Sequence, residues 1–316
     1  MPLPVAAFAQ ALLAAAGLGG GSPPAEDPLA DFTARDKAAL VVVSGLPAPR
    51  GVGGVFVRSW NADAPRPRDT LVFVDQEGGE VRGLPGLPPA PWPSEHATAG
   101  EARAAGRETG AALRRAGVHV DFAPVLDLAG GPLGARHFRR PELGVAFARG
   151  LGEGGVVACV KHFPGLGSAQ HSTDDRPWVL SRFRRAELAA IRAAIRAGVP
   201  CVMTSHAVYR ELGFARALNS PEAHRMLRDW GFEGVVVTDS LSIFSSGPWP
   251  VEWARRALRA GGDLVLYTSP EHARRAIRAL VPLARAGELD EAVLRVLELR
   301  RRAGLPPPGR SPDARC

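Results

Sequence analysis

The sequence predicts an α/β protein built as a (β/α)8 TIM-type barrel that forms a single catalytic domain. Short apolar, β-branched runs alternate with longer stretches rich in Ala, Arg and Leu that have helical periodicity. Most of the short runs are continuously apolar, as expected for parallel strands that helices cover. Polar and charged residues follow several runs, and barrels bind ligands at these carboxyl ends of their strands. The eight predicted strands are 39–44, 55–59, 71–75, 120–125, 156–161, 201–205, 234–239 and 263–267.

The helical stretches between these strands carry recognisable start and stop signals. Thr98-Ala-Gly-Glu101 is a capping box that predicts a helix to about Arg115. Ser220 and Pro221 supply an N-cap and a first-turn proline for a helix before the seventh strand. A short helix is expected over 250–260, and two more after the last strand. An open doubly wound sheet is the alternative, but residues 44–47 are not the glycine-rich phosphate turn that such a sheet normally carries after its first strand.

We expect one folded unit over 31–305, with a signal-like or flexible segment over 1–30 and a flexible tail over 306–316. Residues 3–18 resemble the apolar core of a signal peptide, although no Lys or Arg precedes them and no clear cleavage site follows. A signal that lacks its basic start and a short N-terminal helix both remain open. Export to the cell envelope or the medium is favoured over a cytoplasmic location.

Composition limits the other function classes. The chain has a net charge of +7 and an isoelectric point near 10.2, but its basic residues are spread over helices and aromatic residues make up only 6%. A nucleic-acid partner is therefore not expected, and no apolar run is long enough to predict an integral membrane segment. Cys159 and Cys201 lie in apolar runs and are predicted to be small core residues. No metal-ligand spacing is present, no cofactor is expected, and the oligomeric state is not predicted.

The run Lys161-His162-Phe-Pro-Gly165 is the most informative local feature. Lys37 and Lys161 are the only lysines in a chain whose Lys and Arg together number 39. Because a buried strand cannot hold a Lys and a His without partners, both side chains are expected at the strand's exit, facing a ligand.

Four other strand ends also carry polar groups. Asp75-Gln-Glu-Gly-Gly79 ends the third strand, and Asp127 and Arg136 follow the fourth; His206 and Asp239 end the sixth and the seventh. Carboxylates among many hydrogen-bond donors suit a polyhydroxylated ligand, and one carboxylate can attack an oxocarbenium-like centre. The chain has no nucleophile elbow and no phosphate-binding turn after strands seven and eight, so glycoside hydrolysis is the leading class.

Four segments then give a specific resemblance. Residues 75–79, 122–127, 161–165 and 231–241 occur in the order found in glycoside hydrolase family 3, and the match extends over about 33–304. Within that family the chain resembles the single-domain bacterial β-N-acetylglucosaminidases (β-N-acetylhexosaminidases). The resemblance implies a retaining, exo-acting glycosidase for N-acetylglucosamine-containing cell-wall sugars, such as peptidoglycan fragments, or for related β-glycosides. A carbohydrate substrate is the only partner it implies.

The resemblance also assigns roles to residues of this chain. Asp239 matches the catalytic nucleophile, which forms a covalent glycosyl-enzyme. The expected substrate-binding residues are Asp75, Arg136, Lys161, His162, His206 and Arg82. Arg82 is included because the family commonly shows Arg-Val-x-Arg where this chain has Glu80-Val-Arg-Gly83, so that a sugar-binding Arg is missing or displaced.

The loop after Gly165 departs from the family pattern. The family's acid/base is a His paired with an Asp, as Asp-Ser-His, after Lys-His-Phe-Pro-Gly-His-Gly, whereas Leu166 stands here at the last His of that motif. His171 with Asp174 or Asp175 can supply an imidazole and a carboxylate in reversed order. A surface loop with an incidental His is the other interpretation. Two hypotheses therefore remain: a glycosidase that uses Asp239 with His171 or Asp174, and a catalytically degenerate barrel that binds cell-wall sugars without efficient turnover.

Overall fold

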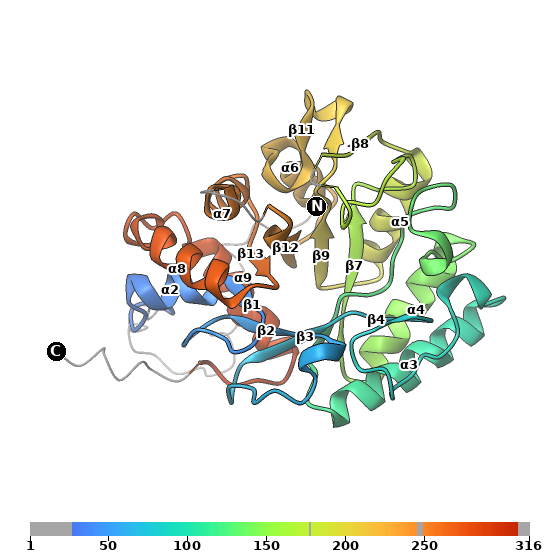
Figure 1. Cartoon of the computed structure of the whole chain (residues 1–316), viewed down its shortest axis with the longest axis horizontal. Helices are drawn as coiled ribbons and strands as arrows, with labels where there is room; N and C mark the ends of the chain where they lie inside the picture. Colours follow the sequence, from blue (N-terminus) through green and yellow to red (C-terminus); the bar gives the residue numbers. More distant parts are fainter. Residues whose placement is uncertain (1–26, 177, 245–248, 309–316) are drawn as a thin grey trace, which may run out of the picture. The chain divides into compact units, whose positions relative to one another are not determined.

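The computed structural model describes residues 27–176, 178–244 and 249–308. The signal-like segment before residue 27, Pro177 and the tail after residue 308 lie outside the described residues. Eight parallel strands form a closed barrel in the order β1-β13-β12-β9-β7-β6-β3-β2 (Figure 1). Neighbours in the barrel are neighbours in the chain, which is the predicted (β/α)8 arrangement. The barrel strands are β1 Val42–Ser44, β2 Gly54–Val57, β3 Leu71–Val74, β6 Val120–Asp121, β7 Val157–Phe163, β9 Cys201–Thr204, β12 Val235–Ser240 and β13 Leu264–Tyr267.

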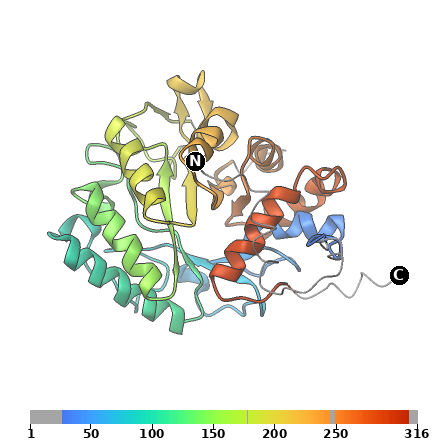
Figure 2. The ribbon, with the colours of Figure 1, turned by 180° about the vertical axis from the view of Figure 1, so that it is seen from behind.

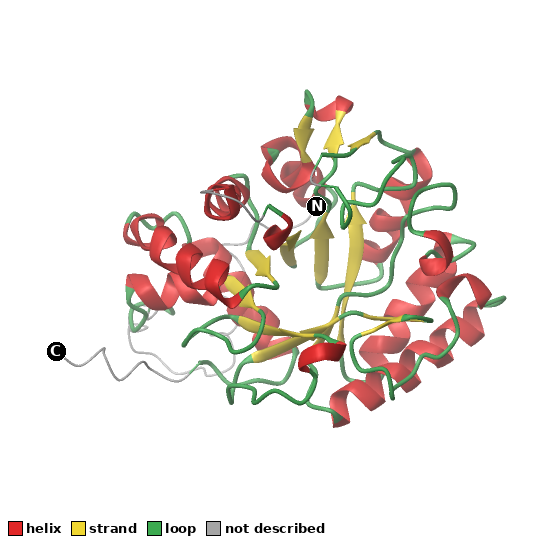
Figure 3. Ribbon diagram, in the orientation of Figure 1, coloured by secondary structure: helices red, strands yellow, loops and turns green. Residues whose placement is uncertain are grey.

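Helices cover the barrel on its outside (Figures 2 and 3). They are α2 Ala34–Leu40, α3 Ala99–Arg115, α4 Pro141–Glu153, α5 Arg185–Arg196, α6 Pro221–Asp229, α7 Trp249–Arg259, α8 Pro270–Arg285 and α9 Asp290–Arg302. Both predicted helix starts are confirmed: Thr98 and Glu101 form the capping box of α3, and the Ser220 side chain accepts a hydrogen bond from the Ala223 N–H at the start of α6. The connections from β1 to β2 and from β2 to β3 contain no α-helix, so helices join fewer strands than expected.

Several predicted strand boundaries were wrong, and the largest differences are at β1, β6 and β7. Ala39 and Leu40 belong to α2, which Thr33 and Asp36 begin with a capping box, and β1 starts only at Val42. Ala and Leu favour a helix once such a cap has started it. β7 continues to Phe163, two residues beyond the predicted end at Lys161, so His162 lies within the strand rather than after it. β6 ends at Asp121, four residues before its predicted end.

Short elements that the sequence did not predict surround the mouth of the barrel. β8 Leu180–Ser181, β10 Val208–Tyr209 and β11 Ala215–Arg216 form one small sheet, and β4 Gln76–Gly78 pairs with β5 Val81–Arg82. The 3-10 helices are η2 Ser59–Asn61, η3 Pro93–Glu95, η4 Gly134–Arg136, η5 Arg210–Leu212, η6 Ala217–Asn219 and η7 Leu241–Ile243. Among the described helices, none combines the length and the apolar character that crossing a membrane requires.

The hydrophobic core has two layers. Side chains of the barrel strands fill the interior, where Val296 and Leu299 of α9 pack against them. A second cluster lies between the strands and helices α3 to α6. Because both faces of the strands are buried, their continuously apolar sequences are explained.

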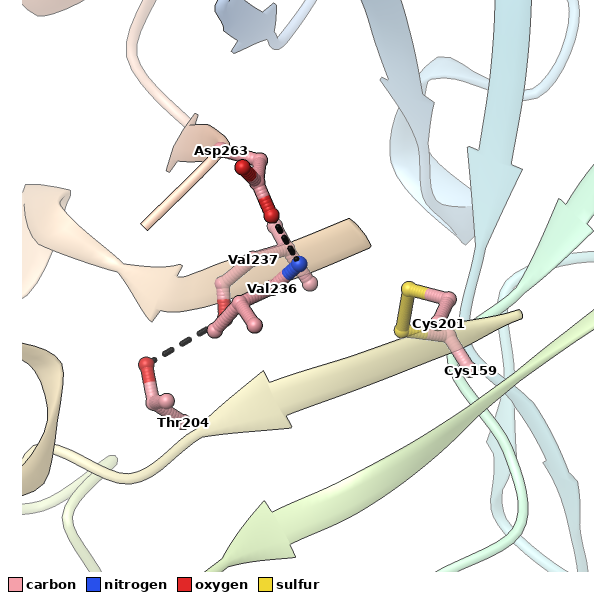
Figure 4. The surroundings of a disulfide bond; sticks show 6 residues. All are labelled: Cys159, Cys201, Thr204, Val236, Val237 and Asp263. Carbon is pink, nitrogen blue, oxygen red and sulfur yellow. Dashed lines mark hydrogen bonds between the residues drawn. A yellow bond between two sulfur atoms is a disulfide. The ribbon is translucent and has the colours of Figure 1, made fainter. Parts of the chain in front are cut away.

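The two barrel cysteines are a correction to the sequence prediction. Cys159 and Cys201 are fully buried, as expected, but they form a disulfide rather than two separate core thiols (Figure 4). They are direct partners in the register of β7 and β9, and their Cα atoms are 4.3 Å apart. This separation is slightly shorter than is usual for a disulfide.

Candidate active site

A cavity of about 170 Å³ lies at the carboxyl ends of the barrel strands. It brings together six of the residues that the sequence singled out, from loops or strand ends far apart in the chain. The lining residues are Phe56, Arg58, Asp75, Val81, Arg136, Lys161, His162, Asp174, Met203, Asp239, Ser240 and Leu266. A small concave site with several convergent polar groups is the usual form of a ligand pocket.

A buried charge network forms one side of this cavity. The Lys161 Nζ atom lies 2.7 Å from Asp75 and 2.6 Å from Glu77. The guanidinium of Arg136 binds both oxygens of Glu77, each at 2.8 Å, in a planar fork. The Glu77 side chain is 0% exposed, and it binds Lys161 and Arg136 without lining the cavity. The Asp75 side chain is 20% exposed and does line the cavity.

The network sets the charge state of its members. Burial alone would raise the pKa of Glu77, but Lys161 and Arg136 outweigh it and lower that pKa to about 2. Burial would lower the pKa of Lys161, but Asp75 and Glu77 raise it above its usual value. Lys161 is therefore a fixed cation and hydrogen-bond donor at neutral pH, and it does not act as a proton-transfer group.

His162 is held in one orientation by Asp127. The His162 Nδ1 atom lies 2.6 Å from the Asp127 carboxylate, which also accepts the backbone N–H groups of His162 and Leu166. With Nδ1 engaged, Nε2 is the ring nitrogen left for a ligand. The sequence showed Asp127 as a strand-end acid, and the structure adds that it acts through His162.

Asp239 lies in the same cavity at the end of β12. Its Oδ1 atom accepts the Ser240 N–H at 2.7 Å. Burial alone would raise the pKa of Asp239, but His206 and His162, together with the Ser240 N–H and Lys161, lower it below the ordinary value. The carboxylate is thus ionised at neutral pH, as a nucleophile must be.

His206 does not line the cavity. It is 2% exposed, and its ring lies 5.1 Å from the ring of Phe244. Burial lowers the pKa of His206 although Asp239 opposes this effect. The structure therefore places His206 next to the predicted nucleophile, rather than among the cavity-lining residues.

The two acid/base candidates on the loop after β7 are placed differently. Asp174 lines the cavity, 3.6 Å from an Arg136 nitrogen, and its side chain is 67% exposed. His171 is exposed and is not among the cavity-lining residues. Leu166, at the position where the family has a His, is fully buried in the outer core layer. The geometry favours Asp174 over His171, and the assignment stays a prediction.

Of two arginines near the cavity, Arg82 and Arg58, only Arg58 lines it. Arg82 donates its Nε–H to the Gly79 carbonyl at 2.7 Å and does not line the cavity, so Val81 faces the site in its place. Arg58, which the sequence analysis missed, does line it, and its guanidinium lies 4.5 Å from the centre of the exposed Trp60 ring. A signal existed, because Arg58 is the charged residue at the end of the second apolar strand.

A wider cavity of about 590 Å³ lies between the loops after β6 and β7, and Arg182 and Arg184 are among its lining residues. None of the predicted site residues lines it, so the smaller cavity is the candidate active site. Among the described residues, no cluster of three or more His, Cys, Asp or Glu side chains is arranged to hold a metal ion.

Comparison with known proteins decides the family. Residues 57–299 match the family model described as the glycosyl hydrolase family 3 N terminal domain, which covers more than half of the chain. The chain belongs to glycoside hydrolase family 3. The resemblance seen in the sequence is confirmed, and the strand-end motifs that carried it all lie within the matched range.

Relatives with curated names are similar over most of the barrel. A β-hexosaminidase of Neisseria meningitidis serogroup B is 35% identical over 228 residues, which are 64% of this chain and 63% of that protein. A β-hexosaminidase of Thioalkalivibrio sulfidiphilus is 37% identical over 240 residues, or 66% and 68% of the two chains. The matched part of the chain thus spans slightly under two thirds of the Neisseria relative's length.

Solved structures agree with this family membership. A family 3 β-N-acetylglucosaminidase from Paenibacillus has a TM-score of 0.78 at 28% identity, covering 88% of this chain and 64% of that chain. A β-N-acetylhexosaminidase from Beutenbergia cavernae has a TM-score of 0.74 at 28% identity, covering 86% of this chain and 99% of that chain.

Proposed function

We propose that this protein is a retaining, exo-acting glycosidase that releases β-linked N-acetylglucosamine from cell-wall sugars or related glycosides. The observation that carries the proposal is the position of Asp239, an ionised carboxylate in a cavity where Lys161, Asp75 and His162 converge. The names of the relatives support the sugar, and the small cavity supports removal of one terminal residue at a time.

In this proposal Asp239 attacks the anomeric carbon of the bound sugar. The glycosidic bond breaks, the leaving oxygen receives a proton, and a covalent glycosyl-enzyme forms. Water then gives a proton to the acid/base group and attacks the same carbon from the opposite side to the first attack; the bond to Asp239 breaks, its carboxylate is released, and the configuration is retained. Asp75, Lys161 and His162 hold the sugar hydroxyls. Glu77 fixes Lys161, Lys161 in turn binds Asp75, and Asp127 orients His162.

Asp174 is the group we assign to proton transfer. It lies in the cavity, 3.6 Å from a nitrogen of Arg136. A carboxyl group can give the leaving oxygen its proton and, once ionised, can take a proton from the attacking water. Because a good leaving group needs little protonation, hydrolysis of an activated substrate should depend less on Asp174 than hydrolysis of an unactivated one.

The test compares two N-acetyl-β-glucosaminides, one with an activated aryl leaving group and one with an alkyl or sugar leaving group. We expect the activated substrate to be hydrolysed faster, and Asp239→Asn to lower its kcat at least about 1,000-fold. Asp229→Asn, which changes an exposed carboxylate on α6, is the control and should leave the rate unchanged.

The same assay identifies the acid/base. Asp174→Asn should slow the unactivated substrate far more than the activated one, and His171→Ala should alter neither. The opposite pattern would assign the role to His171. A wild-type protein that binds N-acetylglucosamine but hydrolyses neither substrate would instead be the degenerate, sugar-binding barrel.

A further inference from the structure

A buried glutamate outside the cavity has no role in the chemistry described above. Glu187 lies in the first turn of α5, is 1% exposed and does not line the cavity. Within the described part of the chain its Oε2 atom has no hydrogen-bond partner. Burying a carboxylate in this way is costly, so a site that keeps one needs a reason.

The contacts of Glu187 supply that reason. Its Oε1 atom accepts two backbone N–H groups, from Leu128 at 3.0 Å and from Gly167 at 2.7 Å. Leu128 lies in the segment between β6 and Arg136, and Gly167 lies in the segment between β7 and Asp174. One carboxylate oxygen therefore joins both loops.

Glu187 packs closely against two glycines, Gly165 and Gly167. A Cβ atom at Gly167 would lie 2.3 Å from Oε1, and a Cβ atom at Gly165 would lie 2.5 Å from Oε2. No side chain larger than hydrogen fits at either position while Glu187 stays in place. The Arg184 guanidinium also donates to the carbonyls of Ala129 and Gly167, so it connects the same two loops a second time.

We propose that Glu187 is a positioning residue that joins the two loops and thereby fixes Arg136 and Asp174 in the cavity. It acts through the loop backbones and does not touch the substrate. The hydrogen bonds of Glu187 and Arg184 to both loops support this proposal. Only its kinetic test rests on the proposed function.

Charge makes this connection sensitive to pH. Burial, with a smaller contribution from Asp127, raises the pKa of Glu187 to about 7, although the Leu128 and Gly167 N–H groups and Arg184 act to lower it. The Tyr209 hydroxyl, on the neighbouring β10, donates to the Gly165 carbonyl rather than to this carboxylate. The pKa of Glu187 is raised while its carboxyl group is buried between the two loops, so the protonated form holds the loops more firmly than the ionised form does. Above pH 7 Glu187 is ionised, and the loops open more readily.

Hydrogen exchange of the full-length protein tests the proposal directly. Glu187→Ala should speed exchange at least about tenfold in peptides that cover 128–136 and 166–176, while exchange in α3 stays unchanged. Glu101→Ala is the matched control, since Glu101 also accepts two backbone N–H groups through one oxygen, but at the exposed start of α3. It should speed exchange at the start of α3 and leave both loops unchanged. Unchanged protection of the loops in a folded Glu187→Ala protein would overturn the proposal.

Glu187→Gln keeps the acceptor oxygen and removes the charge. In the wild type, the opening of both loops, corrected for the intrinsic exchange rate, should rise about tenfold from pH 6 to pH 8. In Glu187→Gln the corrected opening of both loops should stay low and should not change with pH. Wild-type opening that does not change with pH, or an equal change in the Gln variant, would contradict the proposal even if Glu187→Ala fails to fold.

Kinetics give a second and separate readout. Glu187→Ala should lower kcat for the unactivated glycoside more than for the activated one, and Glu187→Gln should restore most of the loss. Equal kcat values for Glu187→Ala and wild type would overturn the positioning role. A wild type with no hydrolysis would contradict the proposed function alone, because the exchange experiment does not depend on activity.

Discussion

Glu77 offers a quantitative test of the charge network beneath the cavity. Its carboxylate is fully buried and is bound by Lys161 and by both arms of the Arg136 fork. The pKa of Glu77 falls from 4.5 to about 2 on folding, which corresponds to about 3 kcal/mol of stability at neutral pH. Glu77→Gln removes this contribution and leaves two cations with one partner fewer.

The pH dependence of this loss has a definite sign. A carboxylate whose pKa is lowered by folding stabilises the protein above its unfolded pKa, and the stabilisation disappears as the pH falls through the folded pKa. Urea denaturation of wild type and Glu77→Gln should therefore differ by about 3 kcal/mol at pH 7 but by only about 1 kcal/mol at pH 3.

Glu298→Gln is the matched control for this measurement. Glu298 also accepts hydrogen bonds from two arginines, Arg301 and Arg302, but all three side chains are at least 42% exposed. Solvent screens such pairs, so the variant should lose less than about 1 kcal/mol. If Glu77→Gln loses no more than Glu298→Gln at pH 7, or loses equally at pH 7 and pH 3, the account of the network is wrong.

Three further predictions follow from neighbouring contacts. Asp127→Asn should lower kcat/KM about 10- to 100-fold in a steady-state assay, because it weakens the charge-assisted bonds that orient His162; an unchanged value would refute that role. Gly167→Ala should destabilise the protein by about 1–3 kcal/mol in thermal unfolding, whereas Gly152→Ala, with open space around it, should not; equal effects would contradict the close approach. The stability of wild type relative to Glu187→Gln should fall by about 3 kcal/mol from pH 4.5 to pH 8, since burial raises the pKa of Glu187 from 4.5 to about 7, and a constant difference would refute this sign.

The barrel could be predicted because its signals are local. Continuously apolar runs, the capping box at Thr98 and the Ser220-Pro221 helix start all depend on residues a few positions apart. The polar residues at the strand ends could also be placed together, since parallel strands in a closed barrel end on the same side. Ala39 and Leu40 were misassigned because apolar residues satisfy either a helix or a strand when the preceding cap is overlooked.

The contacts that organise the site could not be predicted, because they join distant segments. The bond between Cys159 and Cys201 depends on the register of β7 and β9. Glu187 looks like an ordinary glutamate at the start of a helix, and its two loop contacts appear only when the chain is folded. Arg82 has the residue type expected of a sugar-binding group, but the tight turn at Gly79 directs its hydrogen bond to the backbone.

The central claim is that Asp239 forms a covalent bond to the sugar. A fluorosugar analogue of N-acetylglucosamine with a good leaving group slows breakdown of such an intermediate, so that intact-protein and peptide mass spectrometry can locate it. We predict one added sugar per protein, on the peptide that contains Asp239, and none in Asp239→Asn. An adduct on another residue, or turnover of the activated substrate that Asp239→Asn does not slow, would contradict the account.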